Sequence, residues 1–357
     1  MELRRRDPAL DLVRVVAVAT LLGVHFFLNT GFYSELVVGK RMFVMVLMRT
    51  LFMVCVPLFL ILTGYLMNRK TLSRHYYAGV RKTLAIYLLA SLACLALRVL
   101  VLHQELSILG ALRGILDFTA DGYAWYIEMY LGLFLLIPFL NLIYNGLTTR
   151  RGKRALLLTL LLLTALPPLV NSLKVAAAGQ YVKLIPGWWA GIYPITYYFI
   201  GCYLSEFKPR LKGWVGLLLL AAAVVLFGGY NFYRSYQAPF AMGAYQDWGA
   251  LFNVVLTGLL FLLLSGARLE GLPRWGKTAL AKLSDWSLGA YLCSFIADQL
   301  LYPRLNAAVP YMPDRLNYFL LLVLLSFVCS MALSALLNGI YHALAGLFGG
   351  IRARKPD

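Results

Sequence analysis

The sequence is poor in charged residues and has no long polar segment. Only 13% of its 357 residues are charged, whereas 61% are hydrophobic, and the mean hydropathy is +0.74. Soluble globular domains carry about 25% charged residues, so this composition excludes a soluble globule. Apolar stretches recur from residue 11 to about residue 346 with no polar segment large enough to fold alone. We therefore predict a single integral membrane domain over residues 1–357.

Motifs for metal or hydrolytic chemistry are also missing. No His pair or carboxylate cluster has the spacing of a metal site, and the chain has no Walker-type loop and no G-x-S-x-G nucleophile elbow. We therefore expect no metal. The cysteines are odd in number and lie inside apolar runs without metal-type spacing. This pattern predicts small buried apolar residues at Cys55, Cys94, Cys202, Cys293 and Cys329.

The long apolar runs predict an all-α polytopic bundle. A membrane crossing needs about 20 apolar residues, and helices satisfy their backbone amides within the segment, as lipid requires. A β-barrel would show short alternating strands instead. We predict about ten spans, near residues 11–30, 42–66, 82–102, 123–145, 155–172, 186–206, 212–230, 248–266, 285–303 and 317–346.

The basic residues predict the orientation of these spans. With ten spans, 22 of the 33 Lys and Arg residues lie on the side of the two termini, eight lie on the other side, and three lie within spans. By the positive-inside rule, both termini are cytoplasmic. The net charge of +18 is then explained by topology and by attraction to anionic lipid headgroups. We expect membrane lipids as partners, and no nucleic acid.

The first predicted span contains three ionisable residues, Asp11, Arg14 and His25. Such residues are costly in lipid and are functional candidates. At 100° per residue, Arg14 and His25 lie about 20° apart around the helix and about 16 Å apart along it. Asp11 is placed to pair with Arg14 at i, i+3. Snorkelling of Arg14 to headgroups and a hydrogen-bonded core histidine are the alternative interpretations.

Other charged residues predict a wet cavity near the depth of His25. Arg49, Arg98, Glu128 and Asp298 fall toward the extracytoplasmic half of their spans. We assign Arg49, Glu128 and Asp298 to acceptor binding, together with Trp125 and Tyr126 as stacking surfaces for a sugar ring. Pairwise salt bridges between helices, Arg98 with Asp298 above all, and an interfacial aromatic belt are the alternatives.

Arg14 and His25 lie on one face of the predicted helix, which we call the Arg14–His25 stripe. This stripe fits acyl transfer from a long donor. A histidine can take a proton from an alcohol near neutral pH, and an arginine at the cytoplasmic mouth can hold phosphates. Arg81 and Lys82 could add to this phosphate site, or serve only as positive-inside charges. A pantetheine thioester has an arm long enough to join the two sites.

Six segments, in order along nearly the whole chain, resemble the acyltransferase family 3 membrane proteins. The first carries Arg14, ten residues, and then His25. The segments read ALDLVRVVAVATLLGVHFF, VPLFLILTGYLM, RKTLAIYLLA, AWYIEMYLGLFLLIPFLN, YYFIGCYL and LSDWSLGAYL. The resemblance implies transfer of an acyl group, usually acetyl, from cytoplasmic acyl-CoA to extracytoplasmic glycans, cell-wall precursors or lipids. It implies a catalytic role for His25 and a donor-placing role for Arg14.

The chain departs from the family pattern in the ninth predicted span. Many relatives have a histidine shortly after its "YL", where this chain has Cys293 and Ser294. Ser294 or Asp298 would have to replace such a histidine. The resulting hypothesis is an acyl-CoA-dependent O-acyltransferase of the cell membrane, with acetyl-CoA or another acyl-CoA as donor. A transporter or flippase without acyl-transfer chemistry, and a non-enzymatic membrane partner or sensor, are the alternative functions.

Overall fold

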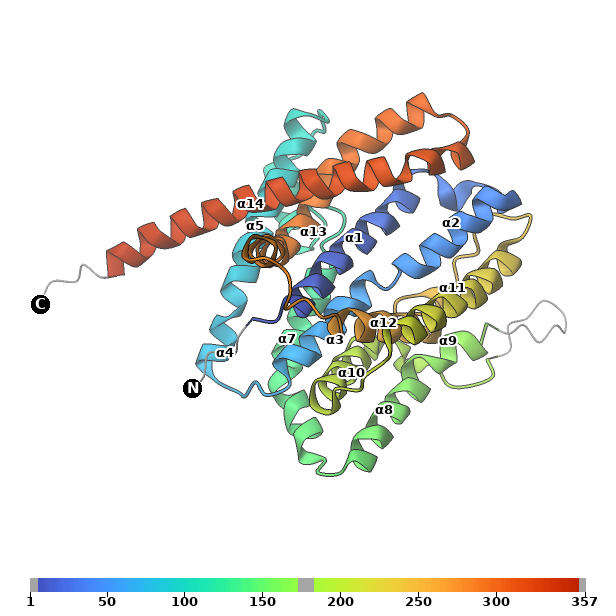
Figure 1. Cartoon of the computed structure of the whole chain (residues 1–357). Helices are drawn as coiled ribbons and strands as arrows, with labels where there is room; N and C mark the ends of the chain where they lie inside the picture. The colour runs from blue at the N-terminus through green and yellow to red at the C-terminus, as the bar shows by residue number, and fades with distance from the viewer. Residues whose placement is uncertain (1–5, 173–182, 353–357) are drawn as a thin grey trace, which may run out of the picture.

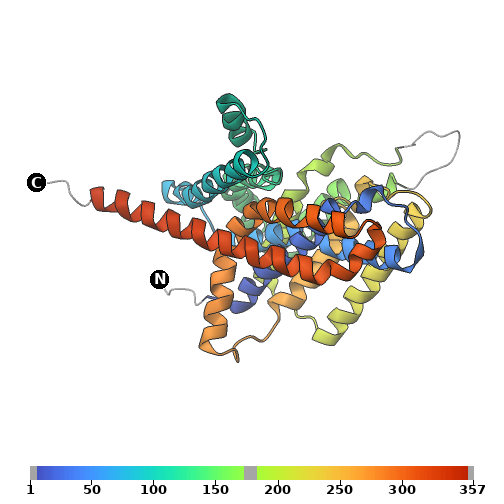
Figure 2. The ribbon, with the colours of Figure 1, turned by 90° about the horizontal axis from the view of Figure 1, so that it is seen from above.

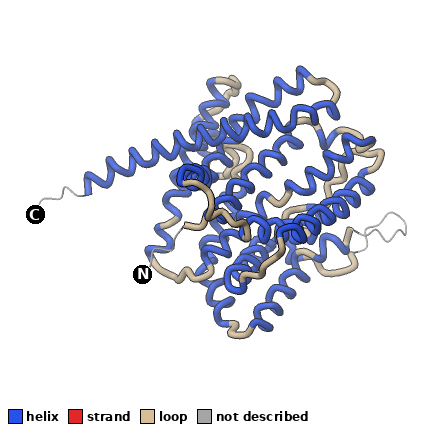
Figure 3. Tube along the Cα trace, viewed as in Figure 1, coloured by secondary structure: helices blue, strands red, loops and turns tan. Residues whose placement is uncertain are grey.

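The computed structural model describes residues 6–172 and 183–352, and this part of the chain is all-α (Figures 1 and 3). In it, only two isolated β-bridges occur, between residues 36–37 and 236–239. The helices are α1 (Pro8–Asn29), α2 (Gly39–Phe52), α3 (Cys55–Met67), α4 (Arg74–Ala78), α5 (Val80–Leu100), α6 (Ile108–Leu116), α7 (Trp125–Gly146), α8 (Arg150–Thr164), α9 (Leu166–Val170), α10 (Tyr193–Phe207), α11 (Gly213–Ser235), α12 (Leu251–Ser265), α13 (Arg274–Ala308) and α14 (Phe319–Arg352). Short 3-10 turns are η1 (Phe32–Ser34), η2 (Trp188–Ile192), η3 (Ala244–Gln246) and η4 (Met312–Tyr318).

The prediction of a polytopic helical bundle is confirmed. Within the described residues, eight helical segments are long and apolar enough to cross a membrane: Pro8–Asn29, Gly39–Met67, Arg74–Leu100, Trp125–Gly146, Arg150–Val170, Gly213–Ser235, Ala244–Ser265 and Met312–Gly346. The other two predicted spans correspond to α10, which has 15 residues, and to α13, which has 35 and begins at Arg274. The total of ten and the cytoplasmic termini stay predictions.

Prolines interrupt two of the predicted spans. The second span is broken between α2 and α3 at Met53 and Val54, and Pro57 lies in the first turn of α3, where its missing N–H is tolerated. The fifth span is broken between α8 and α9, where Pro167 and Pro168 follow directly. The hydrophobic runs continue across both breaks, so hydropathy alone does not reveal them.

Helix α1 lies in the core of the bundle and packs against α3, α13 and α14 (Figure 1). Asp7 caps its N-terminus by accepting a hydrogen bond from the Ala9 N–H, and Pro8 occupies its first position. Val13, Ala17 and Leu22 on this helix are fully buried. The polar side chains of Asp11, Thr20 and His25 on α1 are buried as well.

Two glycines allow α3 and α10 to cross closely. A Cβ atom at Gly64 would collide with the carbonyl of Tyr198, and one at Gly201 would collide with the carbonyl of Ile61. Small residues at such crossings let helix backbones approach in membranes. The glycines of the LTGY and FIGCY segments therefore have a packing role.

Helix α14 runs along the bundle, and its C-terminal part projects beyond the other helices in both ribbon views (Figures 1 and 2). Cys329 lies on its exposed side, so the prediction that all five cysteines are buried is wrong at this position. An exposed apolar side chain is tolerated because lipid is the surrounding solvent there. The other four cysteines are buried.

Candidate active site

The His25 ring lies against a buried carboxylate. His25 Nδ1 is 2.8 Å from Asp298 Oδ2, and both side chains are almost completely buried. Asp298 also accepts hydrogen bonds from the Tyr123 hydroxyl at 3.0 Å and from the Ser326 hydroxyl at 3.2 Å. Ser294 Oγ is more distant, 3.4 Å from His25 Nδ1, and donates instead to a backbone carbonyl at 2.6 Å.

Helical spacing explains why α13 supplies this group. Tyr291, Ser294 and Asp298 are three and four residues apart, so they share one face of α13, and α13 packs directly on α1. The side chains of His25, Tyr123 and Ser326 contact this carboxylate from three different elements. If Asp298 accepts a hydrogen bond from His25 Nδ1–H, His25 Nε2 is left without a proton and can accept one. The structure thus puts Asp298, rather than Ser294, at the ring nitrogen.

At the other end of the stripe, Asp11 has a stronger partner than the predicted one. It accepts hydrogen bonds from Arg6 at 2.7 and 2.9 Å, whereas Arg14 Nη1 is 3.5 Å away. Arg6 also pairs with Asp285 on α13, and the carboxylates of Asp11 and Asp285 raise the Arg6 pKa above its ordinary value. Arg14 Nη1 lies 3.1 Å from Ser284 Oγ. The Arg14 guanidinium is therefore held through Nη1, while its Nε and Nη2 form no hydrogen bond with the described residues.

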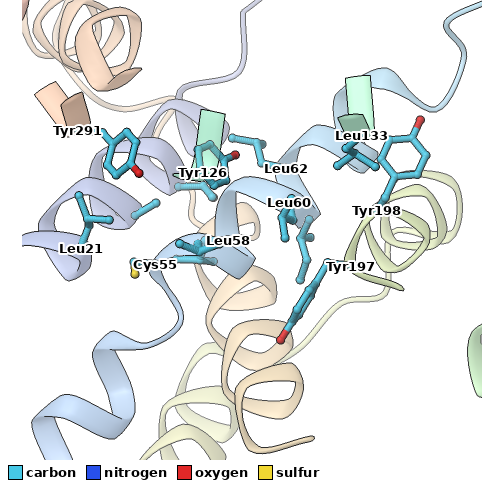
Figure 4. Close-up of a cluster of buried hydrophobic side chains, with 14 of the residues drawn as sticks. Leu21, Cys55, Leu58, Leu60, Leu62, Tyr126, Leu133, Tyr197, Tyr198 and Tyr291 are labelled. Carbon is cyan, nitrogen blue, oxygen red and sulfur yellow. The ribbon is translucent and has the colours of Figure 1, made fainter. Parts of the chain in front are cut away.

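A cavity of about 210 Å³ begins beside Arg14. Leu21, which also lines it, lies seven residues along α1 and about 20° from Arg14 around the helix. The other lining residues are mostly apolar or aromatic: Val56, Phe59, Leu62, Thr63, Leu66, Met67, Thr83, Tyr126, Ile127, Tyr130, Ser287, Leu288 and Tyr291. Figure 4 shows Leu21, Leu62, Tyr126 and Tyr291 gathered between α1, α3, α7 and α13.

The cavity stops short of His25. Its lining ends on α1 at Leu21, four residues and about 6 Å before His25. Near this end, the Tyr291 hydroxyl donates to the backbone carbonyl of Tyr123, and the Tyr123 ring packs on the His25 ring with centroids 4.0 Å apart. Tyr123 thus contacts both Tyr291, which lines the cavity, and His25, which lies beyond its end.

The remaining predicted residues are not brought together. Arg81 and Lys82 are exposed at the start of α5 and do not line the cavity, although their neighbour Thr83 does. Tyr126 is buried and lines it, whereas Trp125 stacks on Trp248 with ring centroids 5.9 Å apart. Glu128 is exposed on α7 and is not a lining residue.

Arg49 occupies a separate buried position. It donates to the side chain of Gln246 at 2.7 Å and lies over the ring of Phe240. Arg98 packs over the ring of Phe295, so the alternative of an Arg98–Asp298 salt bridge is not realised. In the part of the chain that the structure describes, no group of three or more His, Cys, Asp or Glu side chains is arranged to hold a metal ion.

The family model Acyl_transf_3, described as an acyltransferase domain, matches residues 7–337. The chain belongs to this family. This membrane acyltransferase is therefore an enzyme that uses an acyl donor and an acceptor, and the matched region includes Arg14, His25 and Asp298. No curated protein and no solved structure shows a significant match to the chain.

Residues supplied by other helices were missed from the sequence. Tyr123 precedes α7, and Ser326 lies on α14, far from His25 along the chain. The spacing of Tyr291, Ser294 and Asp298 was a usable signal for one polar face of α13. The sequence placed Asp298 near the depth of His25, but it did not indicate that this face of α13 contacts the His25 ring.

Proposed function

We propose that this acyltransferase is an acyl-CoA-dependent O-acyltransferase of the cell membrane. The donor is an acyl-CoA, with acetyl-CoA preferred, bound at the face where α1 begins. The acceptor is a hydroxyl group of an extracytoplasmic glycan, glycolipid or cell-wall precursor. Support comes from the membership in the family and from the arrangement of charged groups along α1.

The donor is held at its phosphate end by Arg14. A guanidinium binds phosphate through parallel charge-assisted hydrogen bonds, and Arg14 keeps free donors at the cavity mouth. The apolar cavity between Arg14 and Leu21 suits a flexible pantetheine arm. The rise of about 16 Å from Arg14 to His25 is within reach of such an arm.

His25 acts as the general base. Its Nε2 accepts the proton of the acceptor hydroxyl while the oxygen attacks the thioester carbonyl. The C–S bond then breaks, and the CoA thiolate takes up the proton from the imidazolium, which leaves an ester and free CoA. Asp298 accepts a hydrogen bond from His25 Nδ1–H and stabilises the imidazolium that forms, as in other acid–histidine pairs.

The single observation that carries this proposal is the 2.8 Å contact between His25 Nδ1 and the buried Asp298 carboxylate. A buried carboxylate that only fills space costs free energy in a membrane. A carboxylate behind a histidine on the face that also carries the Arg14 cavity has a chemical use.

The test is acyl transfer by the purified full chain in proteoliposomes. Radiolabelled acetyl-CoA and cell-envelope material are supplied, and labelled product and free CoA are measured. We expect His25→Ala to lower the rate by about 10²–10⁴-fold, the usual contribution of a general base. His342→Ala, an exposed histidine on α14, is the matched control and should leave the rate unchanged.

Thermal unfolding of both variants shows whether the fold is retained. Near-normal transfer by His25→Ala would overturn the assignment of the general base. Movement of a substrate across the bilayer without release of CoA would instead support the transporter alternative.

A further inference from the structure

A second cavity, of about 820 Å³, lies far from Arg14. It is formed by the segment at α9, by η2, by the end of α11 and by the loop that leads to α12. Its lining residues are Pro167, Pro168, Asn171, Ser172, Lys183, Gly187, Trp188, Ala190, Arg234, Ala241, Met242, Gly243, Ala244 and Tyr245. We call it the α9–α11 cavity. None of the residues assigned above to the donor or to the general base lines it.

The α9–α11 cavity opens on the face of the bundle opposite to Arg14. Arg14 lies in the first turns of α1, and its cavity is lined by Met67 at the end of α3 and Thr83 at the start of α5. Successive long helices cross in alternating directions, so α8–α9 and α11 end at the other face (Figure 1). A ligand in this cavity therefore approaches from the side opposite to the donor.

The lining is cationic. Among the described residues, Lys183 and Arg234 are the charged members of the lining, and no Asp or Glu of residues 6–172 and 183–352 lines the cavity. The Arg234 guanidinium is held in place, because Nη1 donates to the Ser172 carbonyl at 2.9 Å and to the Tyr230 hydroxyl at 3.0 Å. It also packs over the Tyr245 ring at 5.1 Å. Its Nε and Nη2 form no hydrogen bond with the described residues, so they remain available for a ligand.

A second guanidinium lies behind the cavity wall. Arg49 is only 2% exposed, and its Nη2 is 4.0 Å from the sulfur of the lining residue Met242. Among residues 6–172 and 183–352, neither Arg49 nor Arg234 forms an ion pair with a carboxylate. A buried cation without a partner anion costs several kcal/mol, roughly, in free energy. Its field also acts over a longer range than that of an exposed charge, since screening by water is weak there.

An aromatic surface accompanies these charges. Trp188 lines the cavity and is 86% exposed. Its indole offers a flat apolar face with one polar N–H, which suits a ring that has both apolar and polar edges. Asn171 fixes the adjoining segment, since its side chain bonds the backbone of Leu184 and Ile185 at 2.9–3.0 Å. The cavity therefore combines ordered cations with an accessible aromatic ring.

We propose that the α9–α11 cavity binds a phosphorylated sugar. The phosphate is bound by Arg234 and Lys183, in the field of Arg49, and the sugar ring packs on Trp188. The phosphate belongs either to a soluble sugar phosphate or to the headgroup of a lipid-linked sugar, and the chemistry of recognition is the same for both. This binding site does not depend on the identity of the catalytic base.

The test measures ligand-induced thermal stabilisation of the full chain in nanodiscs of zwitterionic phospholipid. Binding to the folded state raises the unfolding midpoint, and the free energy of stabilisation grows with the logarithm of the ligand concentration divided by Kd. The soluble probes are glucose 1-phosphate, inorganic phosphate and glucose. The lipid probe is a polyprenyl-phosphate-linked glucose incorporated in the nanodisc, compared with phosphatidylglycerol at the same density.

We expect glucose 1-phosphate to stabilise the protein more than inorganic phosphate does, and glucose alone to have no effect. Arg234→Gln should weaken binding by about 10-fold or more, the value of one charge-assisted hydrogen bond to phosphate, and Arg234→Lys should restore part of it. Trp188→Ala should lower the affinity for glucose 1-phosphate to that for inorganic phosphate. Arg304→Gln, an exposed arginine near the end of α13, is the control and should bind normally.

Stronger stabilisation by the lipid-linked probe than by the soluble one identifies the lipid as the source of the phosphate, and the reverse order identifies a soluble ligand. Both orders support the site. Equal stabilisation of the wild type and Arg234→Gln, or no stabilisation by any phosphate, would overturn it. Stabilisation by phosphatidylglycerol equal to that by the lipid-linked sugar, unaffected by Trp188→Ala, would refute sugar recognition.

Discussion

Asp298→Asn isolates the electrostatic part of the proposed mechanism. The amide has nearly the same shape as the carboxylate, so packing between α1 and α13 is retained. Its oxygen can still accept from Tyr123 and from His25 Nδ1, but the negative charge is lost. At an effective dielectric constant of about 20, a unit charge about 4 Å from the ring is worth about 4 kcal/mol. Because about 1.4 kcal/mol corresponds to a factor of ten in rate, we expect kcat to fall by about 10²–10³-fold.

The assay for Asp298→Asn is steady-state transfer from labelled acetyl-CoA in proteoliposomes. The KM for acetyl-CoA should stay close to that of the wild type, since Asp298 is far from Arg14 along α1 and α13. Ser294→Ala is the control on the same face of α13, and we expect little change in kcat because the Ser294 hydroxyl donates mainly to a backbone carbonyl. An unchanged kcat for Asp298→Asn, or a defect confined to KM, would refute the role of the carboxylate.

Two further predictions concern the donor site and the packing of the bundle. Arg14→Ala should raise the KM for acetyl-CoA by about 10–100-fold, since hydrogen bonds to charged groups are worth about 1.5–3 kcal/mol. The change in kcat should be smaller. A KM equal to that of the wild type would contradict phosphate binding by Arg14. Gly201→Ala should destabilise the protein by about 1–3 kcal/mol in thermal unfolding, because the added methyl group meets the Ile61 carbonyl. Gly132→Ala is the control, because an added methyl group there would meet no described side chain or neighbouring helix within 4 Å. Equal unfolding midpoints for Gly201→Ala and Gly132→Ala would argue against the close crossing.

Much of the helical architecture is predictable because lipid imposes strong constraints on sequence. Each crossing requires a long apolar run, so the positions of the main helices follow from hydropathy. The relation between Arg14 and His25 was also predictable, since both lie on one helix and helical geometry fixes their angle and rise. These predictions use distances along a single element, where the sequence specifies the structure directly.

Relations between helices were not predictable in the same way. The sequence placed Arg49, Glu128 and Asp298 at similar depths, but depth does not specify which face of each helix points inward. The structure puts Asp298 on His25, Arg49 beside Gln246, and Glu128 at the exposed surface. The packing of α13 on α1 brings Asp298 to His25. Hydropathy does not predict which helices pack together.

The cost of burying Asp298 distinguishes a catalytic from a packing role. A carboxylate within a span costs at least a few kcal/mol, whereas apolar residues such as Leu292 and Cys293 are fully buried on the same helix without that cost. Two hydroxyl groups and one imidazole offset the desolvation of Asp298. The Tyr123 and Ser326 hydroxyls thus bind the carboxylate that contacts His25 Nδ1, the ring nitrogen that a substrate does not need. We infer that the chain retains this carboxylate because the opposite ring nitrogen must accept a proton, at the end of a helix face whose other end binds the donor.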